Sequence, residues 1–470
     1  MGRPDRGPRR LSAVPDEFDL AVLGGGTGGY TAAIRASQLG LRTVVIEKAK
    51  MGGACLHVGC IPTKALLESS GLFHKVRERG PEYGVLAPAA KLDYARIAAR
   101  RDAVVNQLYK GVQGLMRKNK IEVIEGSGTL AGAGAIRVDD RMVKARALIV
   151  ATGSSPKSLP GIDFDGKRII NSDHAVGAKE LPKSICIIGA GAVGVEFATF
   201  YNQVGVKVTL LEGLDRLVPL EDEEVSKALL QAFTKSGIEC RLGAKVTGAK
   251  AAKDGVTVTL EGAEVKADQL LVAVGRGPNS KGIGLEKAGV EVDQRGFVKV
   301  DEWLRTSAKG VWAIGDVVGG FLLAHAAAHE GVIAAEDMAG KRLNPMEQDL
   351  VTRCTYSTPE IASVGLTEAQ ARERGLEVKT GKFPFLANAR AIIHGETDGF
   401  AKLVADAKTG QLLGAHVVGV QATELIGEPA LARLFQGDAW EVGRNIHPHP
   451  TLSEAIGEAA LTVDGAALNI

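Results

Sequence analysis

Two stretches of the chain repeat one pattern: an apolar strand, a glycine-rich turn, a helix and a second strand that ends in an acid. The first stretch contains Gly24-x-Gly26-x-x-Gly29 and ends at Glu47. Glycines in this spacing let the backbone approach a pyrophosphate, which the positive N-terminus of the helix attracts. The acid can accept a hydrogen bond from a ribose hydroxyl. The pattern therefore predicts an α/β unit that binds a dinucleotide.

The second copy contains Gly189-x-Gly191-x-x-Gly194 and ends at Glu212. In both copies the acid follows the last glycine by 18 residues. An acid at this position favours NAD over NADP, because the extra phosphate of NADP calls for a cation. Arg216 follows closely and leaves NADP open. The chain therefore either binds two dinucleotides or carries a duplicated domain.

Later segments supply the strands that would complete these units. Apolar strands ending in glycine turns occupy residues 147–156 and 270–279. The first unit is therefore interrupted, and the second is inserted behind the interruption. A third strand ends at Gly315-Asp316, where the acid could approach a sugar or polyol hydroxyl or simply form a turn. From about residue 347, strands and helices alternate without another glycine motif.

Composition excludes several classes of function. The net charge of +2 comes without a long basic or acidic block, which argues against nucleic acid or a membrane surface as a partner. No apolar run reaches the roughly 18 residues of a transmembrane helix. Residues 1–16 are rich in Arg and Pro and have no apolar core, so we expect a disordered tail and no secretory signal.

Cysteine usage points to a reducing compartment. Five cysteines in 470 residues are too few for a disulfide scaffold. We expect Cys186, Cys240 and Cys354 to be reduced, buried thiols, because they lie among apolar or strand-like residues. A single close pair in such a chain suggests redox chemistry, and we predict a cytoplasmic protein.

The close pair is Cys55 and Cys60, directly before a predicted helix with Pro62 in its first turn. The positive helix N-terminus should favour a thiolate at Cys60. A regular helix holds residues five apart too widely for a disulfide, which needs Cα atoms within roughly 7 Å. Gly59 could allow the necessary distortion. Taken alone, the pair would more often be two separate buried cysteines or a structural disulfide than a redox pair.

A histidine near the C-terminus has an acid within reach. His449 lies between two prolines, and Glu454 begins a predicted helix five residues later. The acid could orient the imidazole through a ring nitrogen, as in an acid–base dyad. A metal site at His447 and His449 is the competing interpretation, which the lack of a nearby Cys or further His disfavours. A loop histidine without a function is the third.

Six stretches together resemble the pyridine-nucleotide disulfide oxidoreductase family, and within it the members that oxidise dihydrolipoamide. They are GGACLHVGCIPTK, GAGAVGVE, AIGDV, LLAHAAAHEG, YSTPEIASVGLTE and HPHPTLSE. The resemblance runs from about residue 17 to the end of the chain. It implies an α/β fold of two Rossmann-like dinucleotide-binding domains, with the NAD domain inserted in the FAD domain, and a C-terminal α+β dimerisation domain.

The resemblance also implies domain boundaries and cofactor sites. The domains would be 17–156 (FAD-binding), 157–279 (NAD-binding), 280–346 (a central domain completing the FAD domain) and 347–470 (dimerisation). The implied FAD contacts, besides the first glycine motif, are Glu47, Lys48, Lys64, Gly128, Thr152, Gly153, Ser154, Asp316, Leu322, Leu323, Ala324 and His325. The implied NAD contacts, besides the second glycine motif, are Glu196, Glu212, Val246 and Gly275.

The roles of the reactive residues are likewise implied by the resemblance. Cys55 would exchange with the substrate, and Cys60 would face the flavin. Lys64 and Glu196 would form a pair beside the flavin ring. His449 and Glu454 would form the acid–base dyad, supplied by the other subunit of a homodimer, with a cis peptide bond before Pro450.

The activity implied in this way is the oxidation of dihydrolipoamide to lipoamide through a Cys55–Cys60 redox disulfide and FAD, with reduction of NAD⁺. The partners would be lipoyl domains of an acyltransferase subunit of a 2-oxo-acid dehydrogenase complex, or a glycine cleavage carrier protein.

Three positions depart from the family pattern. Ala54 stands where Thr is usual, His57 where Asn is usual, and Thr27 where Pro is common.

Three other functions compete with this interpretation. A glutathione-reductase-like enzyme is disfavoured by Glu212. A mercuric reductase would need a second cysteine pair near the C-terminus, which the sequence lacks. A non-catalytic NADH-binding subunit of a lipoyl complex would have no use for the complete set of reactive residues.

Overall fold

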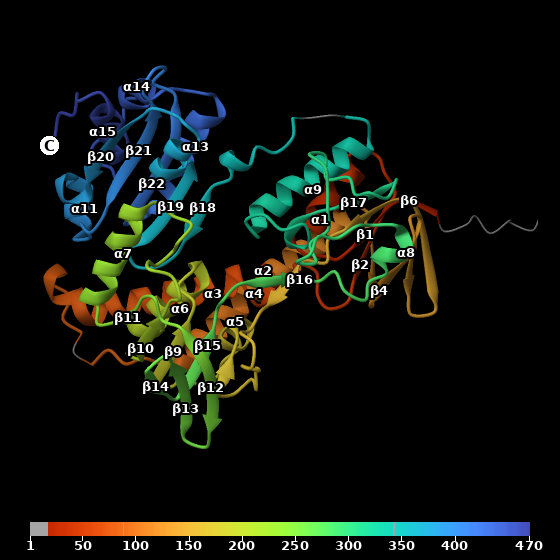
Figure 1. The fold of residues 1–470 in the computed structure, drawn as a ribbon, viewed down its shortest axis with the longest axis horizontal. Helices are drawn as coiled ribbons and strands as arrows, with labels where there is room; N and C mark the ends of the chain where they lie inside the picture. The colour runs from red at the N-terminus through yellow and green to blue at the C-terminus, as the bar shows by residue number, and fades with distance from the viewer. Residues whose placement is uncertain (1–16, 88, 342–343) are drawn as a thin grey trace, which may run out of the picture. The chain divides into compact units, whose positions relative to one another are not determined.

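The computed structural model describes residues 17–87, 89–341 and 344–470, which form two compact units (Figure 1). Of the described residues, the first unit contains those up to Gly53, those of Tyr109–Ser154 and those of Pro278–Pro345. The second contains Ala54–Leu108, Ser155–Gly277 and Met346–Ile470. The expected disordered tail at 1–16 lies outside the described residues, and the domain boundaries given above stay predictions.

The first unit is built on a seven-stranded sheet in the order β3-β2-β1-β6-β5-β4, with β17 also paired to β6. β1, β2, β3, β6 and β17 run parallel, and β4, β5 and β6 form antiparallel hairpins. The strands are β1 (Glu17–Leu23), β2 (Thr43–Glu47), β3 (Glu122–Glu125), β4 (Gly128–Gly132), β5 (Ala135–Val138), β6 (Arg141–Val150) and β17 (Val311–Ala313). Residues 20–23 of β1 and 44–46 of β2 are continuous apolar runs, as expected for parallel strands that are buried on both faces.

Helices α1 (Thr27–Gln38) and α9 (Ala324–Met338) pack against each other in this unit. Glycines make the close approach possible, since a Cβ on Gly28 would meet the carbonyl oxygen of Ala327, and one on Gly331 that of Gly28. The smaller helices are α8 (Leu285–Ala288) and the 3₁₀ turn η3 (Gly315–Val317). Helix α4 (Tyr94–Lys118) is shared by both units.

The second unit contains a five-stranded parallel sheet in the order β11-β10-β9-β15-β8 and a three-stranded antiparallel sheet, β12-β13-β14. The strands are β8 (Ile169–Ile170), β9 (Ser184–Ile188), β10 (Lys207–Leu211), β11 (Glu239–Arg241), β12 (Val246–Ala252), β13 (Gly255–Leu260), β14 (Ala263–Ala267) and β15 (Gln269–Val272). The helices are α2 (Gly53–His57), α3 (Cys60–His74), α5 (Ser172–Val176), α6 (Ala192–Gln203) and α7 (Glu223–Lys235).

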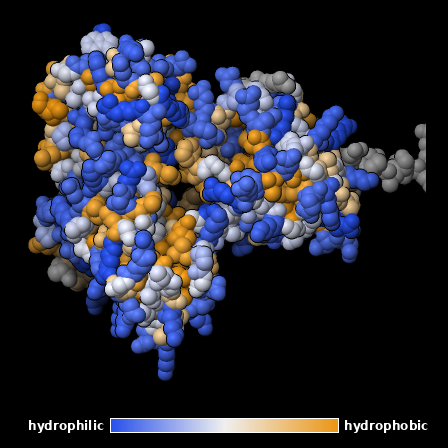
Figure 2. Space-filling model, viewed as in Figure 1, coloured by the Kyte–Doolittle hydropathy of each residue, from blue (hydrophilic) through white to orange (hydrophobic). Residues whose placement is uncertain are grey.

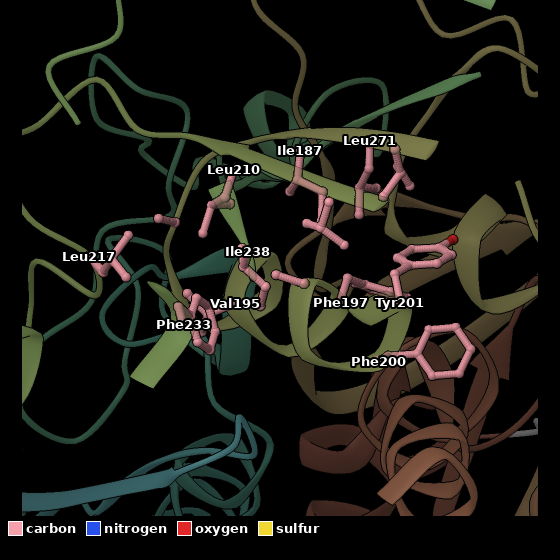
Figure 3. Close-up of a cluster of buried hydrophobic side chains, with 14 of the residues drawn as sticks. Ile187, Val195, Phe197, Phe200, Tyr201, Leu210, Leu217, Phe233, Ile238 and Leu271 are labelled. Carbon is pink, nitrogen blue, oxygen red and sulfur yellow. The ribbon is translucent and has the colours of Figure 1, made fainter. Parts of the chain in front are cut away.

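The main core of the second unit lies between its parallel sheet and α6 and α7 (Figure 3). Phe197 and Tyr201 of α6 lie opposite strand residues such as Ile187 and Leu271, whereas Phe200 points away from the sheet. Leu66 of α3 belongs to the same core, so α3 packs on α6. This packing brings the two helices that carry Lys64 and Glu196 into contact.

The C-terminal part of the second unit has a five-stranded antiparallel sheet in the order β18-β19-β22-β21-β20. Its strands are β18 (Arg353–Thr355), β19 (Glu360–Gly365), β20 (Val378–Pro384), β21 (Phe400–Asp406) and β22 (Leu412–Gly419). Its helices are α10 (Glu368–Glu373), α11 (Ala389–His394), α12 (Ala422–Leu425), α13 (Gly427–Leu434), α14 (Ala439–Arg444) and α15 (Glu454–Val463). The alternation of strands and helices predicted after residue 347 is confirmed.

The surface visible in Figure 2 is mostly hydrophilic, with hydrophobic side chains in smaller groups. Among the helices that the structure describes, none combines the length and the apolar character needed to cross a bilayer.

Candidate active site

The first glycine loop is held in place by the acid that ends β2. Glu47 accepts hydrogen bonds from the backbone N–H of Gly25 (2.7 Å) and of Ala49 (2.8 Å). Gly24 has φ +111°, and a Cβ there would meet the carbonyl oxygen of Ala151. A side chain is thus excluded where the loop passes the end of β6, and the N-terminus of α1 begins directly behind the loop.

A cavity of about 280 Å³ opens beside Glu47 in the first unit. Its lining residues are Glu47, Ala49, Met51, Tyr109, Gln113, Met116, Arg117, Ile121, Val123 and Glu125. The four residues contributed by α4 were missed by the sequence analysis. Their spacing places them on one face of a helix, which is the signal that could have found them. Among the described residues, Lys48 and Gly128 are not part of this lining.

The third strand and its turn bring Asp316 next to Ser154. The Ser154 hydroxyl donates to Asp316 at 2.5 Å. Thr152 donates to the Asn279 carbonyl oxygen (2.8 Å), and the Asn279 side chain donates to the Thr152 carbonyl oxygen (3.0 Å). The predicted contacts therefore belong to two hydrogen-bonded pairs, Ser154 with Asp316 and Thr152 with Asn279. The Gly153 carbonyl oxygen also accepts from the Asn279 N–H (2.9 Å).

Residues Leu322 to His325 lead into the N-terminus of α9. Leu322 has φ +55°, a left-handed conformation that non-glycine residues rarely adopt, and Leu323 is the N-cap residue. Gly128, at the start of β4, is packed against the side chains of Leu23 and Ile46, where a Cβ would not fit. Its lack of a side chain is thus explained by the core of the sheet.

The second glycine loop repeats the geometry of the first. Glu212 accepts from the N–H of Ala190 (2.6 Å) and of Leu214 (2.9 Å). Gly189 has φ +99°, and a Cβ there would meet the Ala273 carbonyl oxygen. Arg216, which left NADP open, donates to the carbonyl oxygen of Pro219 (3.1 Å) within its own loop.

The two remaining predicted NAD contacts lie in the same unit as this loop. Val246 begins β12, and Gly275 has φ +107° in the turn after β15. Both glycine loops therefore fit a dinucleotide, because each leaves room for a pyrophosphate next to a helix N-terminus and presents an acid at the end of the second strand.

Cys55 and Cys60 lie on two successive helices. Cys55 belongs to α2 and Cys60 begins α3, and the chain turns back at Gly59, where a Cβ would come within 3.0 Å of the Ala54 carbonyl oxygen. The expected distortion at Gly59 is present. The five cysteines, all within the described residues, are thiols in this structure.

The two thiols interact, and their acidities differ as a result. The hydrogen bond from Cys55 lowers the pKa of Cys60 to about 7, with the charge of Lys64 contributing and burial and Glu196 opposing. The same hydrogen bond, together with burial, raises the pKa of Cys55. At neutral pH a large fraction of Cys60 is thus the thiolate, which is the reactive form.

Lys64 of α3 and Glu196 of α6 form a bidentate ion pair at 2.7 and 2.8 Å. The Glu196 side chain is 5% exposed and also accepts from the Tyr356 N–H (2.9 Å). The Lys64 ammonium lies 4.7 Å from the centre of the Tyr356 ring. The cation is therefore held between the Glu196 carboxylate and the Tyr356 ring, one turn into the helix that Cys60 begins.

The His449 ring contacts Glu454 through Nδ1 at 2.8 Å, and the ring is 72% exposed. Glu454 also accepts from the Thr451 N–H (2.7 Å). Burial raises the pKa of Glu454, but these two hydrogen bonds and the nearby histidines outweigh it and lower the pKa overall. The peptide bond before Pro450 is cis, as the resemblance implies.

The structure also contains a second histidine–carboxylate pair that the sequence analysis missed. His447 meets Glu428 of α13 through Nε2 at 2.7 Å. His447 and His449 thus bind different carboxylates. The spacing of Glu428 and His447 does not indicate this pair, because it depends on where the folded chain brings the segment before α15 next to α13.

Known proteins of one family resemble the chain over most of its length. The family model for pyridine nucleotide-disulphide oxidoreductases matches residues 18–331, and the model for their dimerisation domain matches 351–460. The chain is 46% identical to the dihydrolipoyl dehydrogenase of Bacillus subtilis, covering 96% of this chain and 99% of the relative. It is 44% identical to that of Zymomonas mobilis, covering 97% and 100%.

Among solved structures, LpdA from Mycobacterium tuberculosis superposes with a TM-score of 0.88 at 30% identity, covering 94% of this chain and 98% of LpdA. The expected fold class, two dinucleotide-binding units with a C-terminal dimerisation domain, is confirmed. The chain belongs to the pyridine nucleotide-disulphide oxidoreductase family.

Proposed function

We propose that the chain is a dihydrolipoyl dehydrogenase, which oxidises dihydrolipoamide to lipoamide and reduces NAD⁺, with FAD and NAD as cofactors. The observation that carries this proposal is the thiol pair: Cys60 is acidified by the thiol of Cys55 and by Lys64, in a chain with two dinucleotide loops. The near-full-length similarity to dihydrolipoyl dehydrogenases supports the same activity.

The first chemical step needs a base and a disulfide. In the oxidised enzyme Cys55 and Cys60 are joined, and His449 of the partner subunit takes the proton of one dihydrolipoamide thiol. The resulting thiolate attacks Cys55, the bond between the two enzyme sulfurs breaks, and Cys60 leaves as a thiolate. The low pKa of Cys60 supports this assignment, because a more acidic thiol is the better leaving group.

The second step releases the product. His449 passes the first proton to the departing Cys55 sulfur and takes the proton of the remaining substrate thiol. That thiol sulfur attacks the substrate sulfur of the mixed disulfide and displaces Cys55, so lipoamide leaves and two electrons stay on the enzyme as the Cys55 thiol and the Cys60 thiolate. When bound, FAD and NAD supply the two-electron and hydride chemistry that no side chain can provide. Lys64, held by Glu196, keeps a positive charge next to the Cys60 thiolate. Glu454 holds the His449 ring through Nδ1, which leaves Nε2 for the substrate.

The partners follow from the same proposal. A second copy of the chain would supply His449, and the match to a dimerisation domain supports a homodimer. The substrate would be the lipoyl group of an acyltransferase subunit or of a glycine cleavage carrier protein. Exchange chemistry at thiols suits a reducing compartment, so we also infer a cytoplasmic location.

One comparison of substrates tests the function. The protein should oxidise dihydrolipoamide with NAD⁺, and should not reduce glutathione disulfide with NADPH. His449→Gln should lower the first activity by several orders of magnitude, because the substrate thiol loses its base. NADH oxidation by ferricyanide, which bypasses the thiols, should persist in the variant. Full dihydrolipoamide activity in His449→Gln would refute the assigned role of His449.

A further inference from the structure

The histidine two residues before the dyad has the opposite environment to that of His449. The His447 side chain is only 8% exposed, whereas that of His449 is 72% exposed. Its Nε2 lies 2.7 Å from Oε1 of Glu428, which lies in the first turn of α13. A ring buried and paired in this way is unsuited to proton exchange with a substrate, so it needs a different role.

The opposite edge of the His447 ring rests on α15. A Cβ added to Gly457 would lie 2.8 Å from both Nδ1 and Cε1 of this ring. Gly457 lies one turn after Glu454, the residue that holds His449. His447 therefore occupies the space between α13 and α15, and only a glycine at 457 leaves room for it.

The segment before His447 is tied to the same acid. The side-chain amide of Asn445 donates to Oε1 of Glu428 (3.1 Å). Glu428 thus fixes the chain at two points directly before His449. The acids that face His447 are Glu428 from α13 and Glu454 from α15, and both favour its charged form. The hydrogen bond to Glu428 is the main cause of the raised pKa of His447.

We propose that His447 is a positioning residue for the His449–Glu454 dyad: its ring, fixed by Glu428 and Gly457, sets the path of residues 445–449 on which the His449–Glu454 contact depends. This inference rests on the proposed function, because the dyad is the base of that reaction. It assigns the first histidine of HPHP a part in the reaction without contact with the substrate.

The primary test compares two substitutions of His447 in the full-length, cofactor-loaded protein. His447→Ala should lower kcat for dihydrolipoamide oxidation by roughly 10- to 100-fold, the cost of misplacing a catalytic group. The KM for NAD⁺ and the NADH–ferricyanide activity should not change. His447→Gln should recover most of the loss, because its amide nitrogen can reach Glu428 as Nε2 does. Glu441→Gln, an exposed acid on α14 of the same domain, is the matched control.

A second variant separates positioning from folding. Gly457→Ala should lower kcat as His447→Ala does, since the new methyl group displaces the ring, although alanine favours a helix. The double variant His447→Ala/Gly457→Ala should be no slower than His447→Ala alone. If the two losses multiply instead, or if His447→Ala leaves kcat unchanged, the proposal is wrong.

A spectroscopic measurement makes the outcome independent of turnover. ¹⁵N spectra of histidine-labelled protein, assigned with His449→Gln, should show His449 protonated at Nδ1 in the wild type. That signature should be lost in His447→Ala and retained in His447→Gln. An unchanged His449 signal in His447→Ala would overturn the inference even if the wild type proved inactive toward dihydrolipoamide, which alone would count against the proposed function.

Discussion

At the scale of single residues, the Cys60 thiol owes its low pKa mainly to the hydrogen bond from Cys55, and two neighbours of opposite charge adjust it. Lys64 lowers the pKa of the Cys60 thiol and Glu196 raises it, and both effects are smaller than that of the Cys55 hydrogen bond. We therefore expect Lys64→Met to raise the Cys60 pKa from about 7 by roughly one unit. Glu196→Gln should shift it downward. The rate of Cys60 alkylation as a function of pH, in reduced protein, measures both shifts.

The two variants are informative because they should shift the Cys60 pKa in opposite directions. Loss of Lys64 also leaves Glu196 buried without its cation, which costs about 3–5 kcal/mol of stability. A general loosening of the site would move the alkylation profile the same way in both variants. Shifts of equal sign would therefore show that charge does not control the thiol.

Glu330 gives the first unit a pH-dependent stability. Burial, aided by Asp316, raises the pKa of this carboxyl to about 7 against the hydrogen bond from the Gly315 N–H. Between its ordinary value of 4.5 and about 7, the folded protein holds a proton that the unfolded chain has lost. Stability should thus fall as the pH rises through this window, by up to about 3 kcal/mol.

Glu330→Gln should remove this pH dependence, because the amide carries no charge and its oxygen can still accept from Gly315. Thermal unfolding should then show the variant more stable than the wild type by a few degrees at pH 8 and similar to it at pH 5. A variant less stable than the wild type at pH 8 would contradict a buried carboxylate at this position.

At the scale of elements, the contact between α1 and α9 depends on glycine. A Cβ on Gly331 would lie 2.6 Å from the Gly28 carbonyl oxygen, which belongs to the backbone and cannot turn aside. Gly331→Ala should therefore destabilise the protein by about 1–3 kcal/mol through overpacking. Gly111→Ala on α4, where the new methyl group meets open space, should stabilise it by about 0.5–1 kcal/mol. Thermal unfolding of the two variants should thus shift in opposite directions.

The elements also show which parts of the site the sequence could predict. Both glycine loops, with Glu47 and Glu212, were predicted because a dinucleotide loop requires fixed residue types at fixed spacing. The cavity face of α4 and the pair of Glu428 with His447 were not. These depend on which helix faces are brought together in the folded chain, and no local spacing encodes that.

The redox role of the thiol pair could be predicted from the sequence only in part. Its spacing is typical of a redox pair only once both dinucleotide units are known, since Cys55 and Cys60 alone fit a structural role. The break at Gly59 could be expected from the geometry of a helix. The ion pair of Lys64 and Glu196, whose lysine acidifies Cys60, was predicted only from the family resemblance. Local spacing could not indicate it, because these residues are 132 positions apart.

At the scale of the whole molecule, the C-terminal sheet carries a row of buried polar side chains, which an isolated sheet would leave exposed. Ser363, His416 and Lys402 are neighbours across β19, β22 and β21. Ser363 donates to Glu221, and Lys402 pairs with Asp222 at 3.2 Å. Both acids precede α7, the helix that follows the Glu212 loop. The dinucleotide fold of the second unit is thus tied to the dimerisation sheet by buried charges.

The proposed role of the dyad requires a second subunit, and one residue beside it tests this requirement. Ile446 is 93% exposed, next to His447 and three residues before His449, where an apolar side chain suits an interface. Ile446→Asp should weaken the homodimer and make dihydrolipoamide oxidation fall steeply on dilution. NADH oxidation by ferricyanide should be independent of dilution, since each chain carries its own dinucleotide loops.

Sedimentation velocity, run beside both assays over a dilution series, measures the dissociation directly. Met142→Asp places the same charge on an exposed apolar residue of the β5–β6 hairpin and should leave the dimer intact. If Ile446→Asp sediments as a monomer and still oxidises dihydrolipoamide at the wild-type rate, His449 does not act across subunits. The base would then serve the thiols of its own chain.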